Sequence, residues 1–227
     1  MDIGTIIWET LIFIIVGYMI GSVLGAQIAN IIFKKSIKNK GSKNQGATNA
    51  VRVAGKRYAL IVVVFDIIKP IIAFFIIYGM SFALTEGIIQ IGAFFTVIGH
   101  MFPWTSGFKG GKGVATTIGL FLMINWIVCL SIGIAWIITY RITRTSSLTS
   151  LIVFWTVGML VWIPTFWQND SFNLLITDAL INFDYSSIYS PIIITIDILL
   201  VTIKHHANIK KIIKGTESTM ILRDQPN

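Results

Sequence analysis

The chain has 227 residues, of which 55% are hydrophobic and only 12% are charged. Soluble domains carry roughly 25% charged residues, so this composition excludes a disordered chain and disfavours a soluble globule. The 18 Lys and Arg residues outnumber the 10 Asp and Glu residues, which gives a net charge of +8. The single cysteine, Cys129, excludes disulfides within the chain and thiolate metal clusters. With a mean hydropathy of +0.79, the chain is predicted to be an integral membrane protein.

The N-terminus does not follow the pattern of a cleavable signal. A secretory signal opens with positive charge and has a short apolar core, whereas here Asp2 and Glu9 precede the first basic residue, Lys34. The long apolar run over residues 6–33 instead predicts a first membrane helix. Because Lys and Arg collect at cytoplasmic flanks, we expect the N-terminus to lie outside.

Apolar runs and basic loops alternate along the rest of the chain. The loop 34–57 after the first span carries eight basic residues, and the loop after the third span carries Lys109 and Lys112. Positive residues mark cytoplasmic loops, which sets the expected direction of each crossing. The further spans are expected at about residues 58–80, 87–102, 114–125, 125–140, 148–167 and 190–203.

The stretch 114–140 decides the number of spans. One long helix would place Arg141 and Arg144 outside, whereas two short helices that meet near Asn125 keep both cytoplasmic. The loop 168–189, with three aspartates and no basic residue, then lies outside, and the C-terminus lies inside. We therefore predict an all-α polytopic membrane bundle, a single domain over residues 1–227, with seven membrane segments. Five full spans is the alternative.

Three cytoplasmic segments contain groups that suit phosphate chemistry. Residues 41–52 (GSKNQGATNAVR), 108–116 (FKGGKGVAT) and 204–211 (KHHANIKK) are rich in glycine, amide, hydroxyl and basic groups. Glycines let backbone N–H groups approach an anion, and the second segment precedes an apolar helix, whose N-terminus favours anions. For the first segment, a solvated loop made basic by its cytoplasmic position is an equally good interpretation.

These segments do not support a nucleotide or metal site. Gly113, rather than Ser or Thr, follows Lys112, so the glycine loop is not a Walker A motif. His205 and His206 are adjacent and diverge on a helix, and no carboxylate or cysteine joins them at ligand spacing. We expect no cofactor, no metal ion and no nucleic-acid partner.

Some residues within the apolar runs are also informative. Asp66, Lys69 and Asp197 are ionisable, and charge inside a membrane is costly enough to indicate a site or a buried pair. Asp66 and Lys69 are three apart, so a self-neutralising pair on one helix face is at least as good an interpretation as contact with substrate. Gly17, Gly21 and Gly25, four apart, place small residues on one face of the first helix, which favours close helix packing.

Taken together, the segments resemble the membrane-integral bacterial glycerol-3-phosphate acyltransferases that use acyl-phosphate donors. The resemblance covers most of the chain, with its motifs in matching order. These motifs are Gly21-Ser22, the run from Gly41 to Arg52, Asp66-x-x-Lys69, Gly99-His100-x-Phe102, the run from Phe108 to Thr116, Arg144-x-x-Ser147-Leu148, and His205-x-x-Asn208-Ile209 followed by Gly215-Thr216-Glu217.

Four positions depart from the pattern of that family. Lys43 stands where glycine is expected, Leu24 where proline is frequent, Pro70 where glycine is usual and His206 where arginine is common. None of these changes removes a hydroxyl, amide or charge that the chemistry needs. They affect the geometry of the loops.

The resemblance implies transfer of a fatty acyl group from acyl phosphate to the 1-hydroxyl of glycerol 3-phosphate, which yields lysophosphatidic acid and phosphate. This reaction is the first acylation of phospholipid biosynthesis, expected at the cytoplasmic face of the bacterial plasma membrane and linked to an enzyme that makes acyl phosphate. The chain lacks the His-x-x-x-x-Asp motif of thioester-dependent acyltransferases. The alternative is an anion transporter, which should repeat polar residues through several spans near the midplane.

The resemblance also implies roles for individual residues. His205 is the candidate general base, held by Asn208, although a phosphate oxygen of the donor could accept the proton instead. Ser42 is expected to position substrate rather than to be acylated, because a nucleophilic serine needs an adjacent base. The remaining candidates are expected to bind substrate: Arg52, Lys112, Lys69, Asn44, Gly46, Asn49, His100, Gly110, Gly111, Gly113 and Ser147.

Overall fold

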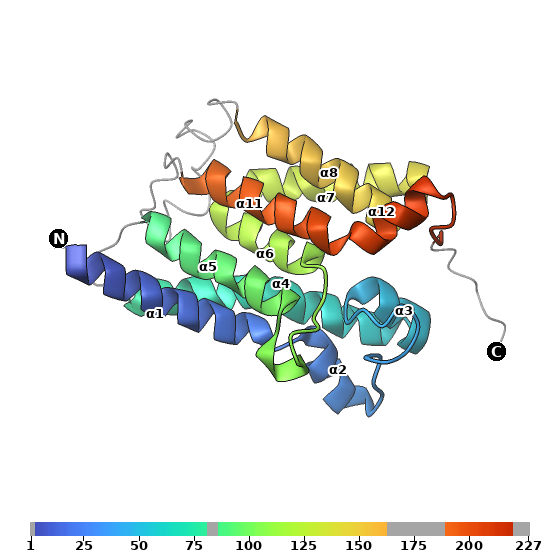
Figure 1. Ribbon diagram of the computed structural model, residues 1–227, viewed down its shortest axis with the longest axis horizontal. Helices are drawn as coiled ribbons and strands as arrows, with labels where there is room; N and C mark the ends of the chain where they lie inside the picture. The colour runs from blue at the N-terminus through green and yellow to red at the C-terminus, as the bar shows by residue number, and fades with distance from the viewer. Residues whose placement is uncertain (1–2, 81–85, 163–188, 220–227) are drawn as a thin grey trace.

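The structure is a computed structural model that describes residues 3–80, 86–162 and 189–219. In these ranges the chain forms helices and connecting loops, without a strand, and most helices lie side by side (Figure 1). The helices are α1 (Ile3–Ser22), α2 (Gly25–Phe33), α3 (Ala47–Ala54), α4 (Lys56–Met80), α5 (Glu86–Met101), the 3₁₀ turn η1 (Trp104–Ser106), α6 (Val114–Ile124), α7 (Trp126–Thr143), α8 (Ser146–Leu160), α11 (Tyr189–Lys204) and α12 (His206–Ile213).

The helices have the length and surface of membrane segments. Residues 3–33, α4 and residues 88–106 are long and apolar enough to cross a bilayer, and α11 with α12 makes a fourth if that bent pair is one span. Residues in α6, α7 and α8 form shorter apolar helices. Large apolar side chains point outward, among them Leu60 and Ile142, which are 61% and 77% exposed. Lipid would cover such faces. The all-α membrane fold is confirmed, whereas seven crossings and their orientation stay predictions.

The polar segments of the sequence gather at one end of the bundle. Figure 1 shows the start of α1, the starts of α5 and α11, and the end of α8 at one end. The short helices α2, α3 and α12 lie at the opposite end, together with the start of α6. Three segments that are far apart in the sequence therefore come within reach of one another there.

The first membrane segment, expected as one helix over residues 6–33, is interrupted between α1 and α2. Leu24 is extended, with φ −82° and ψ 139°, and its N–H donates to Oε1 of Gln27 at 3.0 Å. The N–H of Gly25 donates to Oδ1 of Asp66 at 3.0 Å. Side chains thus satisfy backbone groups that a continuous helix would have paired internally.

The division of residues 114–140 near Asn125 is confirmed. Asn125 follows the last residue of α6 in an extended conformation, with φ −159°. Its side-chain oxygen then accepts the N–H of Val128 at 3.0 Å, which caps the start of α7. Asparagine is among the residues that cap helices best, so this single residue ends one helix and begins the next.

The last membrane helix does not run straight on over residues 204–211. It bends by 62° between α11 and α12 at His205. The N–H of His205 still donates to the carbonyl of Val201 at 3.1 Å, and its own carbonyl accepts the N–H of Asn208 at 2.8 Å. His205 therefore lies at the corner between the membrane helix and a short helix at the polar end.

Close packing of α1 on α5 holds the polar end together. A Cβ atom on Gly21 would lie 2.2 Å from the carbonyl oxygen of Thr96, so only glycine allows this approach. The small residues of the first helix thus pack as predicted. Beyond this contact, buried aromatic side chains of three other helices, Phe74, Phe121 and Phe154, form part of the apolar core.

Candidate active site

Lys112 lies on the glycine loop at the start of α6. Gly113, with φ +92°, caps this helix, and its carbonyl accepts the N–H of Thr117 at 2.7 Å. The first backbone N–H groups of a helix have no partner within it, and they carry the positive end of the helix dipole. The loop therefore combines a lysine with a helix N-terminus that favours anions.

A chain of hydrogen bonds joins Lys112 to two distant segments. Its Nζ donates to Oδ1 of Asn208 at 2.5 Å. The amide of Asn208 donates in turn to Oε1 of Glu217 at 2.6 Å, and the hydroxyl of Ser147 donates to the same oxygen at 2.7 Å. The glycine loop, α12, the C-terminal segment and α8 thus meet at one place.

Positive charge exceeds negative charge around Lys112. Burial lowers the pKa of Lys112 to about 8, an effect that the Glu217 carboxylate opposes and the charges of Lys211 and Arg52 reinforce. Arg52 comes from α3 and donates to the hydroxyl of Ser218 at 2.8 Å. Several cations near a single carboxylate suit a phosphate dianion, which would restore charge balance.

His205 lies beside this cation cluster and is only 2% exposed. Burial, and next the charge of Lys112, lower the pKa of His205 to about 4, so its ring is neutral near pH 7. Its Nδ1 is 2.8 Å from the carbonyl oxygen of Val201. Because a carbonyl can only accept, Nδ1 carries the proton and Nε2 keeps a free lone pair. The ring is therefore in the tautomer that a base at Nε2 requires.

Asn208 has other partners than predicted, whereas His206 diverges from His205 as expected. Asn208 was expected to hold the His205 side chain, but its amide group bonds to Lys112 and Glu217. His206 is exposed, and its Nδ1 lies 3.1 Å from the carbonyl oxygen of Ile203. Asn208 thus connects to the Lys112 loop, while His206 faces away from it.

Asn49 organises the first polar segment from inside. It is 1% exposed, and its amide donates to the carbonyls of Lys40 and Asn44 at 3.0 and 2.9 Å. Its oxygen accepts the N–H of Ser42 at 2.9 Å. Gly46 follows in the loop as the N-cap of α3. Asn49 thus shapes the loop, while the Ser42 side chain is exposed and, among the described residues, makes no hydrogen bond to His205.

Lys43 adopts a left-handed conformation, with φ +59°. At this position the family that the sequence resembles is expected to have glycine. Glycine reaches such a conformation without a steric penalty because it has no Cβ. A residue with a Cβ pays about 1–2 kcal/mol there. The loop therefore keeps its shape in spite of the substitution.

Lys69 and His100 lie in a buried cluster within the bundle. The pairing of Asp66 with Lys69 that the spacing suggested is confirmed, with Nζ 3.0 Å from Oδ1. The Nδ1 of His100 is 3.0 Å from the same Nζ. In the described part of the chain, none of these side chains bonds to Lys112.

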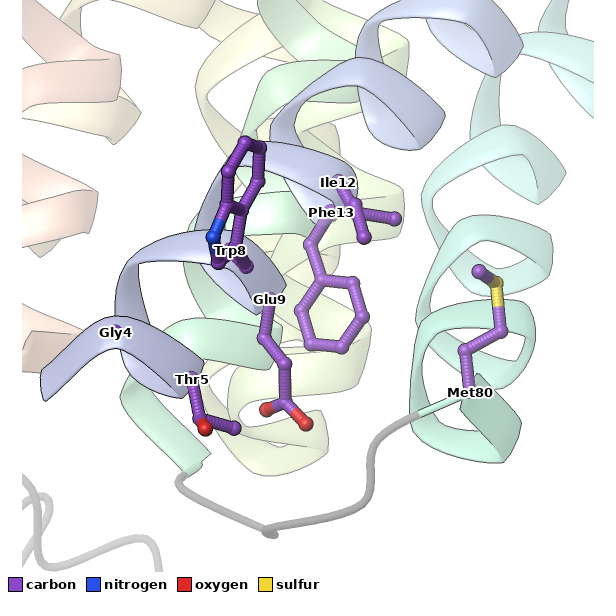
Figure 2. A pocket seen from close by; sticks show the side chains of 7 residues that line it. All are labelled: Gly4, Thr5, Trp8, Glu9, Ile12, Phe13 and Met80. Carbon is purple, nitrogen blue, oxygen red and sulfur yellow. The ribbon is translucent and has the colours of Figure 1, made fainter. Parts of the chain in front are cut away.

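A cavity of about 520 Å³ lies at the other end of the bundle. Figure 2 shows Met80 of α4 opposite side chains of α1, including Trp8 and Phe13. From Thr5 on its wall to the end of α1 at Ser22, the helix rises roughly 25 Å at 1.5 Å per residue. The cavity is thus far from the cation cluster.

Comparison with known proteins decides the family. A family model described as Glycerol-3-phosphate acyltransferase matches residues 11–215. The chain belongs to the glycerol-3-phosphate acyltransferase family. Glycerol-3-phosphate acyltransferase of Bartonella henselae is 33% identical over 222 residues, 96% of each chain. That of Francisella tularensis subsp. novicida is 36% identical over 206 residues, 90% of each chain.

Solved structures support the same family. A crystal structure of PlsY (YgiH), described as an integral membrane glycerol 3-phosphate acyltransferase in its glycerol 3-phosphate form, matches with a TM-score of 0.76 and 25% identity. The match covers 93% of this chain and 96% of that one. The protein is thus a membrane acyltransferase, and the transporter alternative is wrong.

Glu217 contacts the predicted site residues Ser147 and Asn208, although the sequence did not indicate it as a candidate. The Gly-Thr-Glu motif at residues 215–217 marked the segment, but nothing local indicates what the carboxylate contacts. Only the fold places Glu217 between Ser147 and Asn208 and close enough to act on the charge of Lys112.

Glu217→Gln should move the alkaline limit of activity to lower pH. The amide oxygen of glutamine can still accept from Ser147 and Asn208, but the negative charge that favours the Lys112 cation is lost. The pKa of Lys112 then falls below its value of about 8, and phosphate binding weakens at a lower pH. The measurement is kcat/KM for glycerol 3-phosphate from pH 6 to 9. An unchanged alkaline limit would show that Glu217 does not support this charge.

Proposed function

We propose that this acyltransferase transfers a fatty acyl group from acyl phosphate to the 1-hydroxyl of glycerol 3-phosphate, giving lysophosphatidic acid and inorganic phosphate. The observation that carries the proposal is the position of Lys112. Its half-buried ammonium extends from a glycine loop, and its charge acts on neutral His205 at the end of an apolar bundle. Related PlsY crystal structures are described as glycerol 3-phosphate and lysophosphatidic acid forms.

The proposed substrates match the two kinds of surface at this end of the protein. A phosphate group needs cations and backbone donors, which Lys112, Arg52 and the residues 110–113 supply. The fatty acyl chain needs an apolar medium, which the lipid around the helices supplies. A site where the membrane helices end lets a water-soluble acceptor meet a lipid-soluble donor.

In the proposed reaction one bond forms and one breaks. The acceptor oxygen attacks the carbonyl carbon of acyl phosphate, and the new ester C–O bond forms. The bond between that carbon and the phosphate oxygen breaks, and phosphate leaves with the electron pair. The hydroxyl proton passes either to Nε2 of His205 or to the departing phosphate. Because acyl phosphate is already an activated anhydride, orientation and charge neutralisation are the main requirements.

In this mechanism Ser42 positions substrate and does not carry the acyl group. A serine nucleophile needs a base within hydrogen-bond reach. The Ser42 hydroxyl is exposed, and its backbone N–H is held by Asn49. Direct transfer between the two substrates needs no acyl-enzyme.

The test is product formation by purified protein in detergent. With palmitoyl phosphate and radiolabelled glycerol 3-phosphate, it should form lysophosphatidic acid and inorganic phosphate in equal amounts. Palmitoyl-CoA should not replace palmitoyl phosphate, and Lys112→Gln serves as the inactive control. Turnover with palmitoyl-CoA alone would overturn the proposed donor, while lysophosphatidic acid formation without release of inorganic phosphate would overturn the proposed reaction.

We infer further that the site faces the cytoplasm of a bacterial cell, with the N-terminus outside. Eight basic residues lie in the loop 34–57, and the loop 168–189, of which residues 168–188 lie outside the described part of the chain, has three aspartates and no basic residue. In a Cys129→Ala background, Asn169→Cys should react with an impermeant thiol reagent in intact cells, whereas Asn39→Cys should react only after the membrane is opened. The reverse pattern of labelling would invert the topology.

A further inference from the structure

A buried charged cluster closes the break between α1 and α2. Lys69 of α4 donates to the carbonyl of Gly21 at 3.1 Å, near the C-terminus of α1. Asp66 of the same helix accepts the N–H of Gly25 at 3.0 Å, at the start of α2. A cation at a helix C-terminus and an anion at a helix N-terminus both oppose the helix dipole favourably. One ion pair thus fixes two helix ends inside the bundle.

Lys69 is enclosed by polar groups of the protein. An ammonium group has three N–H bonds. Nζ of Lys69 lies 3.0 Å from Oδ1 of Asp66, 3.1 Å from the Gly21 carbonyl and 3.0 Å from Nδ1 of His100. The side chain is only 5% exposed. Polar atoms of the protein thus surround its ammonium, which favours a part in positioning other residues over direct contact with substrate.

His100 connects this cluster to the glycine loop. Nδ1 of His100 lies 3.0 Å from Nζ of Lys69 and 3.3 Å from Oδ1 of Asp66, so both members of the ion pair hold the ring. The Nε2 side of the ring faces Gly111, where an added Cβ would lie 2.0 Å from Nε2. The carbonyl of His100 also accepts the N–H of Gly111 at 3.1 Å. Ring and backbone of one residue thus both hold the residue that precedes Lys112.

We propose that Asp66, Lys69 and His100 form a positioning unit that fixes the Lys112 loop through the contact of the His100 ring with Gly111. In this arrangement Lys69 orients His100, and His100 sets the position of Gly111. The position of Gly111 in turn fixes where the neighbouring Lys112 can bind phosphate. Lys69 and His100 then act through the loop and do not touch phosphate. The inference rests on the proposed function, because phosphate binding by Lys112 is its readout.

The cost of the cluster supports this role. Removing an ion pair from water costs several kcal/mol per ion, and apolar residues of similar volume are often equally stable. In the present bundle the pair is 1% and 5% exposed, so packing alone gives no reason for it. What the ion pair adds over an apolar pair is direction, because Lys69 donates and Asp66 accepts hydrogen bonds at fixed positions.

The experiment is a double-mutant cycle on Gly111 and His100. Gly111→Ala places a methyl group against the ring and should raise KM for glycerol 3-phosphate about tenfold, within the coupling range of residues in contact. His100→Asn keeps a polar group near the position of Nδ1, beside Lys69 and Asp66, but omits the ring atoms that face Gly111. The double variant Gly111→Ala/His100→Asn should therefore have a lower KM than Gly111→Ala alone, with a smaller change in kcat.

Gly110→Ala is the matched control. A Cβ atom at Gly110 would lie 1.9 Å from the carbonyl oxygen of His100, which is backbone, so His100→Asn cannot relieve that contact. Relief of Gly111→Ala but not of Gly110→Ala supports the proposal. The proposal is overturned if Gly111→Ala has wild-type kinetics or if His100→Asn does not lower its KM. It is also overturned if His100→Asn lowers the KM of Gly111→Ala and Gly110→Ala equally.

Two further measurements separate this inference from the proposed function. Wild-type protein without turnover on palmitoyl phosphate would refute the proposed function itself. In that case the same variants are compared by their melting temperatures, without ligand, in detergent. His100→Asn should again reduce the loss of stability caused by Gly111→Ala. It should leave the loss caused by Gly110→Ala unchanged. If Gly111→Ala destabilised the protein equally with His100 and with His100→Asn, the proposed contact between the His100 ring and Gly111 would be refuted.

Discussion

Lys112→Gln should lower kcat/KM for glycerol 3-phosphate roughly 100-fold, mainly through KM. A hydrogen bond to a charged group contributes about 1.5–3 kcal/mol, and each 1.4 kcal/mol changes an equilibrium tenfold. Lys112→Arg should restore little of this loss, because a planar guanidinium does not fit a place shaped for a compact ammonium. The measurement is steady-state kinetics with palmitoyl phosphate held at saturation.

Lys109→Gln is the control for this prediction. Lys109 lies on the same loop, but its side chain is exposed, and its backbone carbonyl accepts from Gln45 at 2.6 Å. Removing its charge should leave kinetics close to those of the wild type. If Lys109→Gln and Lys112→Gln lowered kcat/KM equally, Lys112 would contribute only to the general positive field of the loop.

The pH dependence gives an independent check of the Lys112 charge. Its pKa is lowered to about 8, so the ammonium is present below pH 8 and is lost as the pH rises through that value. Binding of a phosphate dianion should weaken accordingly, and kcat/KM should fall above pH 8. The residual activity of Lys112→Arg should lack this alkaline limit, because a guanidinium stays protonated.

The features that the sequence predicted are those set by nearby residues. Asn125 ends α6 and caps α7 within three positions, so the division of that apolar run could be predicted locally. Asp66 and Lys69 are one helical turn apart, so their pairing followed from helix geometry. The three polar segments were recognisable because each gathers its polar and basic groups within one short stretch of sequence.

The features that the sequence did not predict depend on contacts between distant segments. The break between α1 and α2 is satisfied in part by Asp66, which lies 41 residues beyond Gly25. Glu217 gains its role from Ser147, 70 residues earlier. Amide and basic groups also serve folding as well as binding, which is why Asn49 and Lys69, both expected to bind substrate, have their donors engaged by the protein. Residue type alone cannot separate these uses.

His205→Ala should lower kcat 10²–10⁴-fold, the range of a group that transfers a proton, whereas His206→Ala should have little effect. The difference follows from the bend at His205. His205 is buried near Lys112 with its proton on Nδ1, while His206 is exposed and its Nδ1 lies 3.1 Å from the carbonyl oxygen of Ile203. Both variants should be purified in parallel and compared by size-exclusion chromatography before their kinetics are measured. A damaging His206→Ala with a harmless His205→Ala would reverse the assignment.

The identity of the proton acceptor needs His205→Gln rather than a pH profile near neutrality. An ordinary histidine, with a pKa of about 6.5, would give an acid limit between pH 6 and 7. Burial and the charge of Lys112 lower the pKa of His205 to about 4, so the ring is already neutral there and kcat/KM should be flat in that range with either acceptor. Glutamine keeps a polar group of similar reach but cannot take up the proton. If His205 is the base, His205→Gln should be nearly as slow as His205→Ala. If the donor phosphate accepts the proton, His205→Gln should retain much of the wild-type kcat, and the role of His205 is to orient the substrates.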